Sequence, residues 1–240
     1  MYVSEPFLAS LRRLKGKLVM GGGKSLDPVV ESLAATQLGF LSEDYLPWSA
    51  SAISRQVAVR LCNELAVNQR RFIVEFGPGI STLVMARWAE TSRVPISILG
   101  VEESLEWLHY LQSRLEGMSL SFARVRLIHA PLRAATGSYP VPVRRWYDLA
   151  VDDLGPDPFD LVLVDGPSAY LRDNRFDRYP ALSAVRPLLS EDCVVVLDDS
   201  DRRGEAEVVR TWSRELHDEQ WMLTRCGGAA WWTRGRAFTT

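Results

Sequence analysis

The sequence predicts an α/β fold built on a doubly wound, mostly parallel sheet, because short β-rich runs alternate along it with longer helical stretches. The runs are almost wholly apolar, which is typical of strands buried on both faces of a parallel sheet. The 240 residues are 47% hydrophobic and 24% charged, the balance of a globular protein with enough apolar material for a full core. The five runs are Phe72–Phe76, Ile96–Val101, Val125–Ile128, Leu161–Val164 and Cys193–Leu197.

Helical patterns follow the second and the fifth run. Ser104 stands where its hydroxyl can cap the first of these helices, and the second lies within Glu205–His217. Apolar residues at helical spacing predict the face that each helix buries. They are Leu105, Leu108 and Leu115 in the first helix, and Val209, Trp212 and Leu216 in the second.

The C-terminal region predicts a β-hairpin. Trp221–Cys226 and Ala229–Thr233 are short β-rich runs, and Gly227-Gly228 joins them. A two-residue Gly-Gly connection favours a tight antiparallel turn, since glycine adopts positive φ angles without strain. The sheet is therefore expected to have seven strands and to end in an antiparallel pair.

The first 50 residues precede the first strand and contain helical fragments. Pro47-Trp48-Ser49 leads into a helix expected through Ile53–Leu65. We expect residues 1–50 to form a helical cap over the sheet, and residues 51–240 to form the main domain.

Charge and apolar patterning exclude several classes of protein. The formal net charge is -2, whereas a nucleic-acid-binding surface carries a positive excess. No apolar run reaches the roughly 20 residues of a membrane span, and the N-terminus is a poor signal peptide. Cys62, Cys193 and Cys226 form no metal-binding or disulfide pattern. We expect a cytoplasmic protein that binds neither nucleic acid nor membrane; the sequence does not indicate its oligomeric state.

A turn with two glycines follows the first predicted strand. Gly77-Pro78-Gly79 stands between this strand and a helix expected to begin near Ser81-Thr82. Glycines at such a turn let backbone and ligand approach closely, and the free N–H groups of the helix start favour an anion or carboxylate. Glu75 lies two residues before the first glycine.

The second predicted strand ends at another acidic position. Glu102 lies 23 residues after Gly79, where a carboxylate can accept hydrogen bonds from both hydroxyls of a ribose. Both signals fit one ligand only if the first two strands are neighbours. The next residue, Glu103, is expected to be solvated.

These two motifs, VEFGPGIST and GVEES, resemble those of the class I S-adenosylmethionine-dependent methyltransferases, and the similarity extends from about Pro47 to the C-terminus. The resemblance implies a Rossmann-like fold and S-adenosylmethionine as cofactor. It places the methionine part of the cofactor at the two-glycine turn, the ribose at Glu102 and the adenine near His129, where the acidic residue common in the family is missing. The implied cofactor residues are Glu75, Gly77, Pro78, Gly79, Ser81, Thr82, Glu102, Ala130, Pro131, Leu132 and Asp165.

Three aspartates follow the fourth and fifth predicted strands. Asp165, Asp198 and Asp199 converge if these strands are adjacent, and they repel one another unless they are protonated, separated or bridged by a cation. Mg²⁺ prefers such oxygen ligands; the alternative is a set of hydrogen-bonded strand-end carboxylates. The arrangement resembles metal-dependent O-methyltransferases that act on sugars or catechol-like diols. The resemblance implies a small-molecule or saccharide hydroxyl as acceptor and makes Asp165 the candidate catalytic residue. Pro167 and Ser168 stand where the sugar enzymes carry a further acid, so the general base is unassigned.

Two segments, Leu132–Pro158 and Pro167–Pro180, are too long for simple turns and are expected to be lids, substrate loops or surface decoration. Arginines in the second can bind an anionic group of the acceptor or pair with Asp173 and Asp177.

Three alternatives to a methyltransferase share parts of this pattern. A nicotinamide dehydrogenase needs glycine or alanine at the position of Thr82, which disfavours it. A module that binds the cofactor without catalysis stays open. So does a transferase that uses decarboxylated S-adenosylmethionine to donate an aminopropyl group, because paired acidic residues can hold a polyamine.

Overall fold

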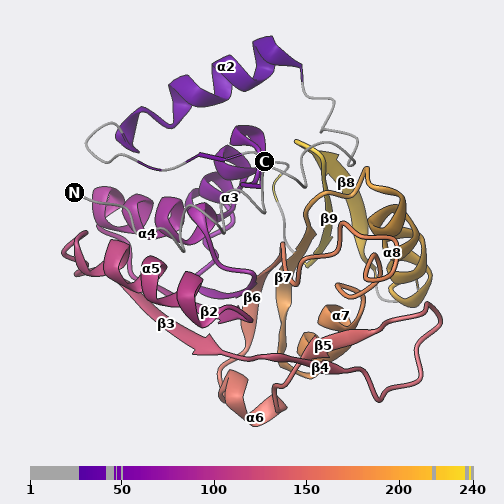
Figure 1. Ribbon diagram of the computed structural model, residues 1–240. Coiled ribbons are helices and arrows are strands. Elements are labelled where there is room, and N and C mark those ends of the chain that lie inside the picture. Colours follow the sequence, from indigo (N-terminus) through magenta and orange to yellow (C-terminus); the bar gives the residue numbers. More distant parts are fainter. Residues whose placement is uncertain are drawn as a thin grey trace.

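The computed structural model describes residues 27–41, 46, 48–49, 51–217, 220–235 and 238, and within them a seven-stranded sheet forms the centre of the molecule. Its strand order is β3-β2-β1-β6-β7-β9-β8 (Figure 1). The first five strands in this order, β3, β2, β1, β6 and β7, pair in parallel, and β9 pairs antiparallel with β7 and β8. The predicted Rossmann-like, doubly wound sheet with a terminal hairpin is confirmed. The strands are β1 Phe72–Phe76, β2 Ile96–Glu102, β3 Ala123–His129, β6 Phe159–Val164, β7 Leu189–Leu197, β8 Met222–Cys226 and β9 Ala229–Arg234.

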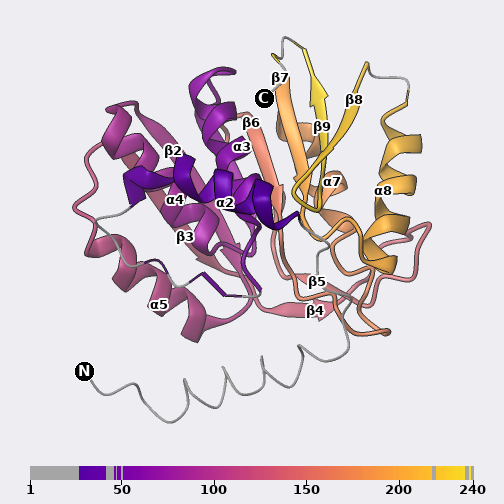
Figure 2. The same ribbon diagram turned by 90° about the horizontal axis from the view of Figure 1, so that it is seen from above.

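Helices cover both faces of the sheet (Figures 1 and 2). One face carries α3 Arg55–Ala66, α4 Ile80–Ser92 and α5 Leu105–Glu116; the other carries α7 Pro180–Val185 with η2 Arg186–Leu188, and α8 Arg203–Glu215. Alternate strand residues enter the two cores, so that Ile73 packs on the α3–α5 side and Val74 on the α7–α8 side. Both faces need apolar side chains, which is why the strand runs are apolar without alternation.

The strand order changes direction at β1, which lies between β2 and β6. Ligands of doubly wound sheets bind outside the carboxyl ends of the strands at such a switch point. A short pair, β4 Leu132–Ala134 and β5 Arg145–Tyr147, follows directly from the end of β3, and α6 Val151–Leu154 comes after it (Figure 1). The long predicted segment Leu132–Pro158 therefore has regular structure of its own at this edge.

Two predictions about burial are wrong. Val125–Ile128 is not buried on both faces, because β3 is an edge strand of the sheet and only Ala123 in it is buried. Leu105 is 47% exposed, while Leu108 and Leu115 are buried as predicted. Leu105 lies about a quarter turn from the buried face at 100° per residue, and Leu111 completes that face instead.

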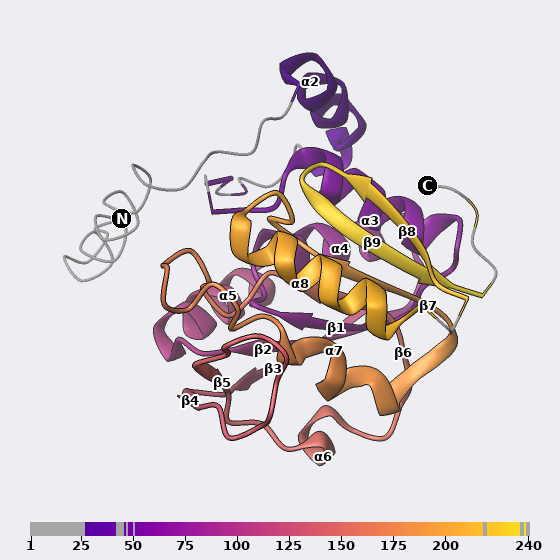
Figure 3. The same ribbon diagram turned by 90° about the vertical axis from the view of Figure 1, so that its right-hand side faces the viewer.

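The C-terminal elements follow the prediction closely. Val209, Trp212 and Leu216 are buried on α8, and the β8–β9 hairpin lies beside α3 (Figure 3). Ser54 joins the two regions, because its hydroxyl donates to the Gly227 carbonyl at 2.8 Å and accepts from Val57 N at 3.2 Å. This cap starts α3 at Arg55, two residues later than expected.

The N-terminal part is described only from residue 27, with α2 Pro28–Gln37 and η1 Gly39–Leu41. α2 packs against α3 on the side away from the sheet, and Ala34 is its buried residue (Figure 3). Pro47 and much of the predicted 1–50 cap lie outside the described residues, so the boundary at residue 51 stays a prediction. The three cysteines are free. Among the helices described, none has the length and apolar character to cross a membrane.

Candidate cofactor site

Gly77 lies where the turns after β1 and β6 touch backbone to backbone. Its φ is +80°, and a Cβ atom there would lie 2.6 Å from Gly166 N and 2.8 Å from Gly166 Cα. Phe76 O accepts from both Asp165 N and Gly166 N, at 2.9 and 2.7 Å. Only glycine fits this conformation and this contact. The first glycine of the motif therefore positions the two turns that meet at the switch point. The Gly166–Pro167 peptide of the second turn is cis.

Gly79 faces open space instead. A Cβ atom there would have one close neighbour, a ring carbon of Trp107 at 3.9 Å. Trp107 is fixed beside the turn, since its indole Nε1 donates to Pro78 O at 2.8 Å. α4 begins at the next residue, so the N–H groups of its first turn point toward this end of the sheet. The second glycine leaves room for a ligand next to a helix N-terminus and an aromatic ring.

The carboxylate of Glu75 stabilises the two-glycine turn from the buried side. It is fully buried and accepts hydrogen bonds from the hydroxyls of Ser81 and Thr82, the latter at 2.6 Å. Burial raises the pKa of Glu75 to about 7, although the two hydroxyls act in the opposite direction. Ser81 and Thr82 are buried as well. These three residues shape the two-glycine turn, and we expect them to act on a ligand through it.

Glu102 ends β2 and lies beside this turn, because β1 and β2 pair in parallel with Phe76 opposite Val101. Only 7% of Glu102 is exposed, and its Oε1 accepts from Ser104 N at 2.7 Å. Burial raises the pKa of Glu102 to about 7. Glu103, expected to be solvated, is half-buried. The neighbouring strands required for one shared ligand are present.

The end of β3 borders Glu102. Ala130 N donates to Glu102 O at 2.8 Å, and Ala130 is buried while Pro131 is exposed. Leu132 pairs with Tyr147 across the β4–β5 ladder. Tyr147 is 4% exposed, and its hydroxyl oxygen would collide with a Cβ atom at Gly166. Tyr147 thus joins the β3 end to the β6 turn.

The three strand-end aspartates converge as predicted. Asp165, Asp198 and Asp199 each place an oxygen within 4.8 Å of the others. The cation among them is the guanidinium of Arg178, whose Nη2 lies 3.1 Å from Asp165 Oδ1 and whose Nη1 lies 3.2 Å from Asp199 Oδ2. Arg202 Nη1 adds a second contact to Asp199 Oδ2 at 2.8 Å. Two guanidinium groups therefore balance most of the charge of the three carboxylates.

For Arg178, the predicted pairing of the loop arginines with Asp173 and Asp177 is wrong. Asp177 accepts from the backbone N–H groups of Arg144 and Arg145, and Asp173 pairs with the exposed Arg144. Arg178 pairs with Asp165 and Asp199, not with Asp173 or Asp177. The loop after β6 is thereby fastened to the strand ends.

Arg178, Tyr147 and Trp107 belong to the site and were missed from sequence. Arg178 had one signal: three converging carboxylates favour a cation between them, and an arginine stands in the loop after β6. Tyr147 and Trp107 had none, because their contacts with Gly166 and Pro78 join positions far apart in the chain.

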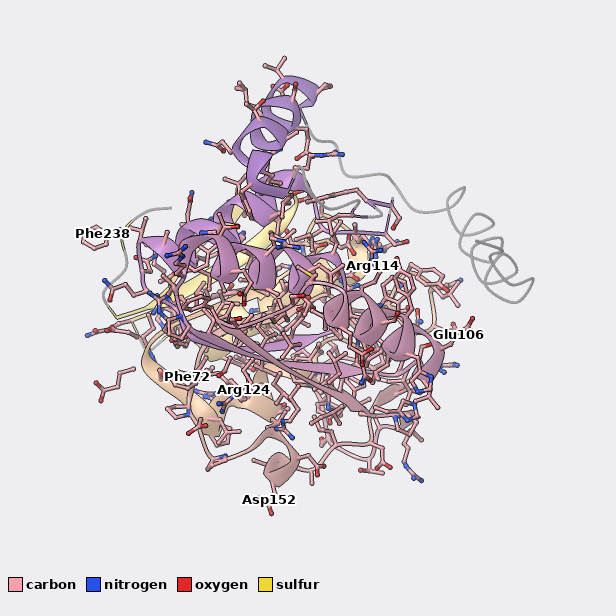
Figure 4. All side chains as sticks on the ribbon, turned by 90° about the vertical axis from the view of Figure 1, so that its left-hand side faces the viewer. Phe72, Glu106, Arg114, Arg124, Asp152 and Phe238 are labelled. Carbon is pink, nitrogen blue, oxygen red and sulfur yellow. The ribbon has the colours of Figure 1, made fainter. Side chains whose placement is uncertain are left out.

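A shallow depression of about 500 Å³ lies at the opposite end of the sheet. Phe72, Ser97 and Arg124 are among its lining residues. Figure 4 shows Phe72 and Arg124 close together, away from Glu106, which follows the carboxyl end of β2. Strand polarity places this depression far from the two-glycine turn and from Glu102.

A family model described as "Methyltransferase domain" matches residues 74–200, from β1 to the three residues after β7. No curated protein sequence matches the chain.

Two solved structures illustrate the fold. The SAH-bound methyltransferase PaMTH1 of Podospora anserina is 14% identical with a TM-score of 0.56, and the match covers 99% of this chain and 98% of that one. The O-methyltransferase NovP is 13% identical with a TM-score of 0.55, over 86% of this chain and 100% of that one. At such identities the likeness establishes the fold.

Proposed function

This chain belongs to the methyltransferase-domain family, and from that premise we propose that it binds S-adenosylmethionine and transfers the methyl group to a hydroxyl oxygen of a small molecule or saccharide. The observation that carries the proposal is the buried Glu102 carboxylate beside the two-glycine turn of the neighbouring strand. Family membership favours methyl transfer over aminopropyl transfer. The O-methyltransferase fold of NovP supports oxygen as the acceptor atom.

Each part of the cofactor has a matching feature. Glu102 accepts the two ribose hydroxyls, and the open space at Gly79 admits the methionine part, whose carboxylate meets the N-terminus of α4. Ala130–Leu132 borders the adenine. The sulfonium is a cation, and the surrounding carboxylates of Glu102 and Asp165 favour it electrostatically.

The chemistry requires an acceptor oxygen held in line with the carbon–sulfur bond. A carbon–oxygen bond forms as the carbon–sulfur bond breaks, S-adenosylhomocysteine (SAH) is released, and the hydroxyl proton is lost. Positioning supplies much of the rate of such a transfer. Asp165, at the end of β6, can accept a hydrogen bond from the acceptor or from the cofactor ammonium, and Arg178 holds it in place.

Isotope transfer tests this function. The full chain is incubated with methyl-labelled S-adenosylmethionine and a panel of sugars, catechols and phenols, and both labelled product and SAH are quantified. Equal amounts of the two support the proposal. Binding of SAH without turnover on any acceptor identifies a non-catalytic module. Release of methylthioadenosine from decarboxylated S-adenosylmethionine with a polyamine identifies an aminopropyltransferase.

The affinity for SAH is expected to rise about 10-fold from pH 6 to pH 8. Ribose hydroxyls donate to the ionised form of Glu102, so binding lowers its pKa from about 7 and releases a proton. Calorimetry at pH 7 in two buffers of different ionisation enthalpy measures this proton. Glu102→Gln should remove both effects while Glu75, with a similar pKa, remains. A pH dependence that survives in Glu102→Gln would assign the proton to another group.

A further inference from the structure

The guanidinium of Arg178 lies at Asp165, Asp198 and Asp199, where the sequence predicts a divalent cation as one alternative. We propose that it balances the charge of these carboxylates in place of a metal ion, so that this chain has no resident divalent metal among Asp165, Asp198 and Asp199. This proposal about metal binding does not depend on the proposed function.

Hydrogen bonding saturates this guanidinium. A guanidinium has five N–H donors, and Arg178 has five acceptors. Nε donates to Pro167 O at 3.1 Å, Nη1 to Asp198 O at 3.3 Å and to Asp199 Oδ2 at 3.2 Å, and Nη2 to the carbonyl and the Oδ1 of Asp165. A metal ion that bound the same oxygens would leave the buried guanidinium without hydrogen-bond acceptors.

The burial and the charge of Arg178 also support its place among the aspartates. The Arg178 side chain is 4% exposed, so it cannot turn into water without opening the loop. Asp165 and Asp199 hold the guanidinium from two sides, and an arginine stays protonated in proteins. Glu205 also approaches Nη1, at 3.9 Å. The cation is thus permanently charged and held from several sides.

The loop itself is built to keep the guanidinium there. Asp177, the residue before Arg178, is held by hydrogen bonds that its carboxylate accepts from Arg144 N at 2.8 Å and Arg145 N at 3.2 Å. On the other side, α7 begins at Pro180, directly after Tyr179, whose carbonyl accepts from Trp212 Nε1. The backbone on both sides of Arg178 is therefore fixed, and this holds its side chain among the aspartates.

Manganese binding to the unmodified chain of 240 residues gives the first test, by electron paramagnetic resonance and by thermal unfolding. We expect no saturable Mn²⁺ binding at about 1 mM and no change of Tm with Mg²⁺, Mn²⁺ or EDTA. Stoichiometric Mn²⁺ binding that Asp199→Asn abolishes would overturn the proposal. SAH titration of the same sample reports separately on the proposed function, because a failure to bind SAH leaves the metal result intact.

Removing the guanidinium gives the second test. Arg178→Ala leaves uncompensated carboxylates and is expected to lower Tm by roughly 6–20 °C, of which millimolar Mn²⁺ or Ca²⁺ restores a part. Arg144→Ala, which removes an exposed arginine from its pair with Asp173, is the matched control and should show neither effect. If Arg178→Ala matches the wild type in Tm with and without metal, the guanidinium does not hold the cluster together and the proposal fails. If Arg178→Ala does not fold, the wild-type measurement decides alone.

Discussion

Gly77→Ala is expected to lower the free energy of unfolding by about 2–5 kcal/mol, through strain at positive φ and overpacking. The added Cβ would lie 2.6 Å from the backbone nitrogen of Gly166, a group that cannot rotate away. Gly166 N is also hydrogen-bonded to Phe76 O, so a shift would cost that bond as well. Urea denaturation measures the change.

Gly79→Ala is the matched control for this variant. Its Cβ would meet only a Trp107 ring carbon at 3.9 Å, so stability should stay within about 0.5 kcal/mol of the wild type. The same methyl group occupies the space that a ligand needs at the helix start, and binding of SAH should weaken. Equal stability of the two variants would contradict the different roles given to the two glycines.

Glu102→Ala is expected to weaken SAH binding by about 2–4 kcal/mol, or roughly 30- to 1,000-fold, through the loss of two charge-assisted hydrogen bonds. The carboxylate is almost fully buried, so water replaces it poorly. Calorimetry gives the affinity. Glu106→Ala removes an exposed carboxylate from the start of α5 and should bind normally (Figure 4).

A ribose analogue makes the assignment of Glu102 specific. SAH that lacks the 2′-hydroxyl should bind the wild type more weakly than SAH, and bind Glu102→Ala about as well as SAH does. Independent, additive losses from the two changes would show that Glu102 acts elsewhere than on the ribose.

Local patterns predicted most of the fold. The apolar runs for β1, β2, β6 and β7 were recognisable because both faces of these strands enter a core. β3 differs in sequence, because Arg124 and Arg126 alternate in it with apolar residues, and this pattern is typical of a strand with an exposed face at the sheet edge. The prediction for Leu105 was wrong for a different reason. Its spacing from Leu108 is helical, but Leu105 lies outside the face of the helix that is buried.

The sequence also predicted some residues of the candidate site and not others. Gly77, Gly79 and Glu102 were predictable, because each stands at the end of a strand that its own sequence reveals. Arg178 was not, because its five acceptors come from two segments, Asp165–Pro167 and Asp198-Asp199, that meet only in the folded chain. For the acidic set, the sequence left open a metal site or a group of hydrogen-bonded carboxylates, because it does not show that Arg178 lies between Asp165 and Asp199.

The central claim is that the Gly77–Gly79 turn and Glu102 form one site for an S-adenosyl cofactor. Calorimetric titration of the full chain with SAH, with NAD as the control ligand, tests it most directly. Micromolar binding of one SAH per chain and no binding of NAD is the predicted result. No binding of SAH, or binding of NAD in its place, would contradict the claim.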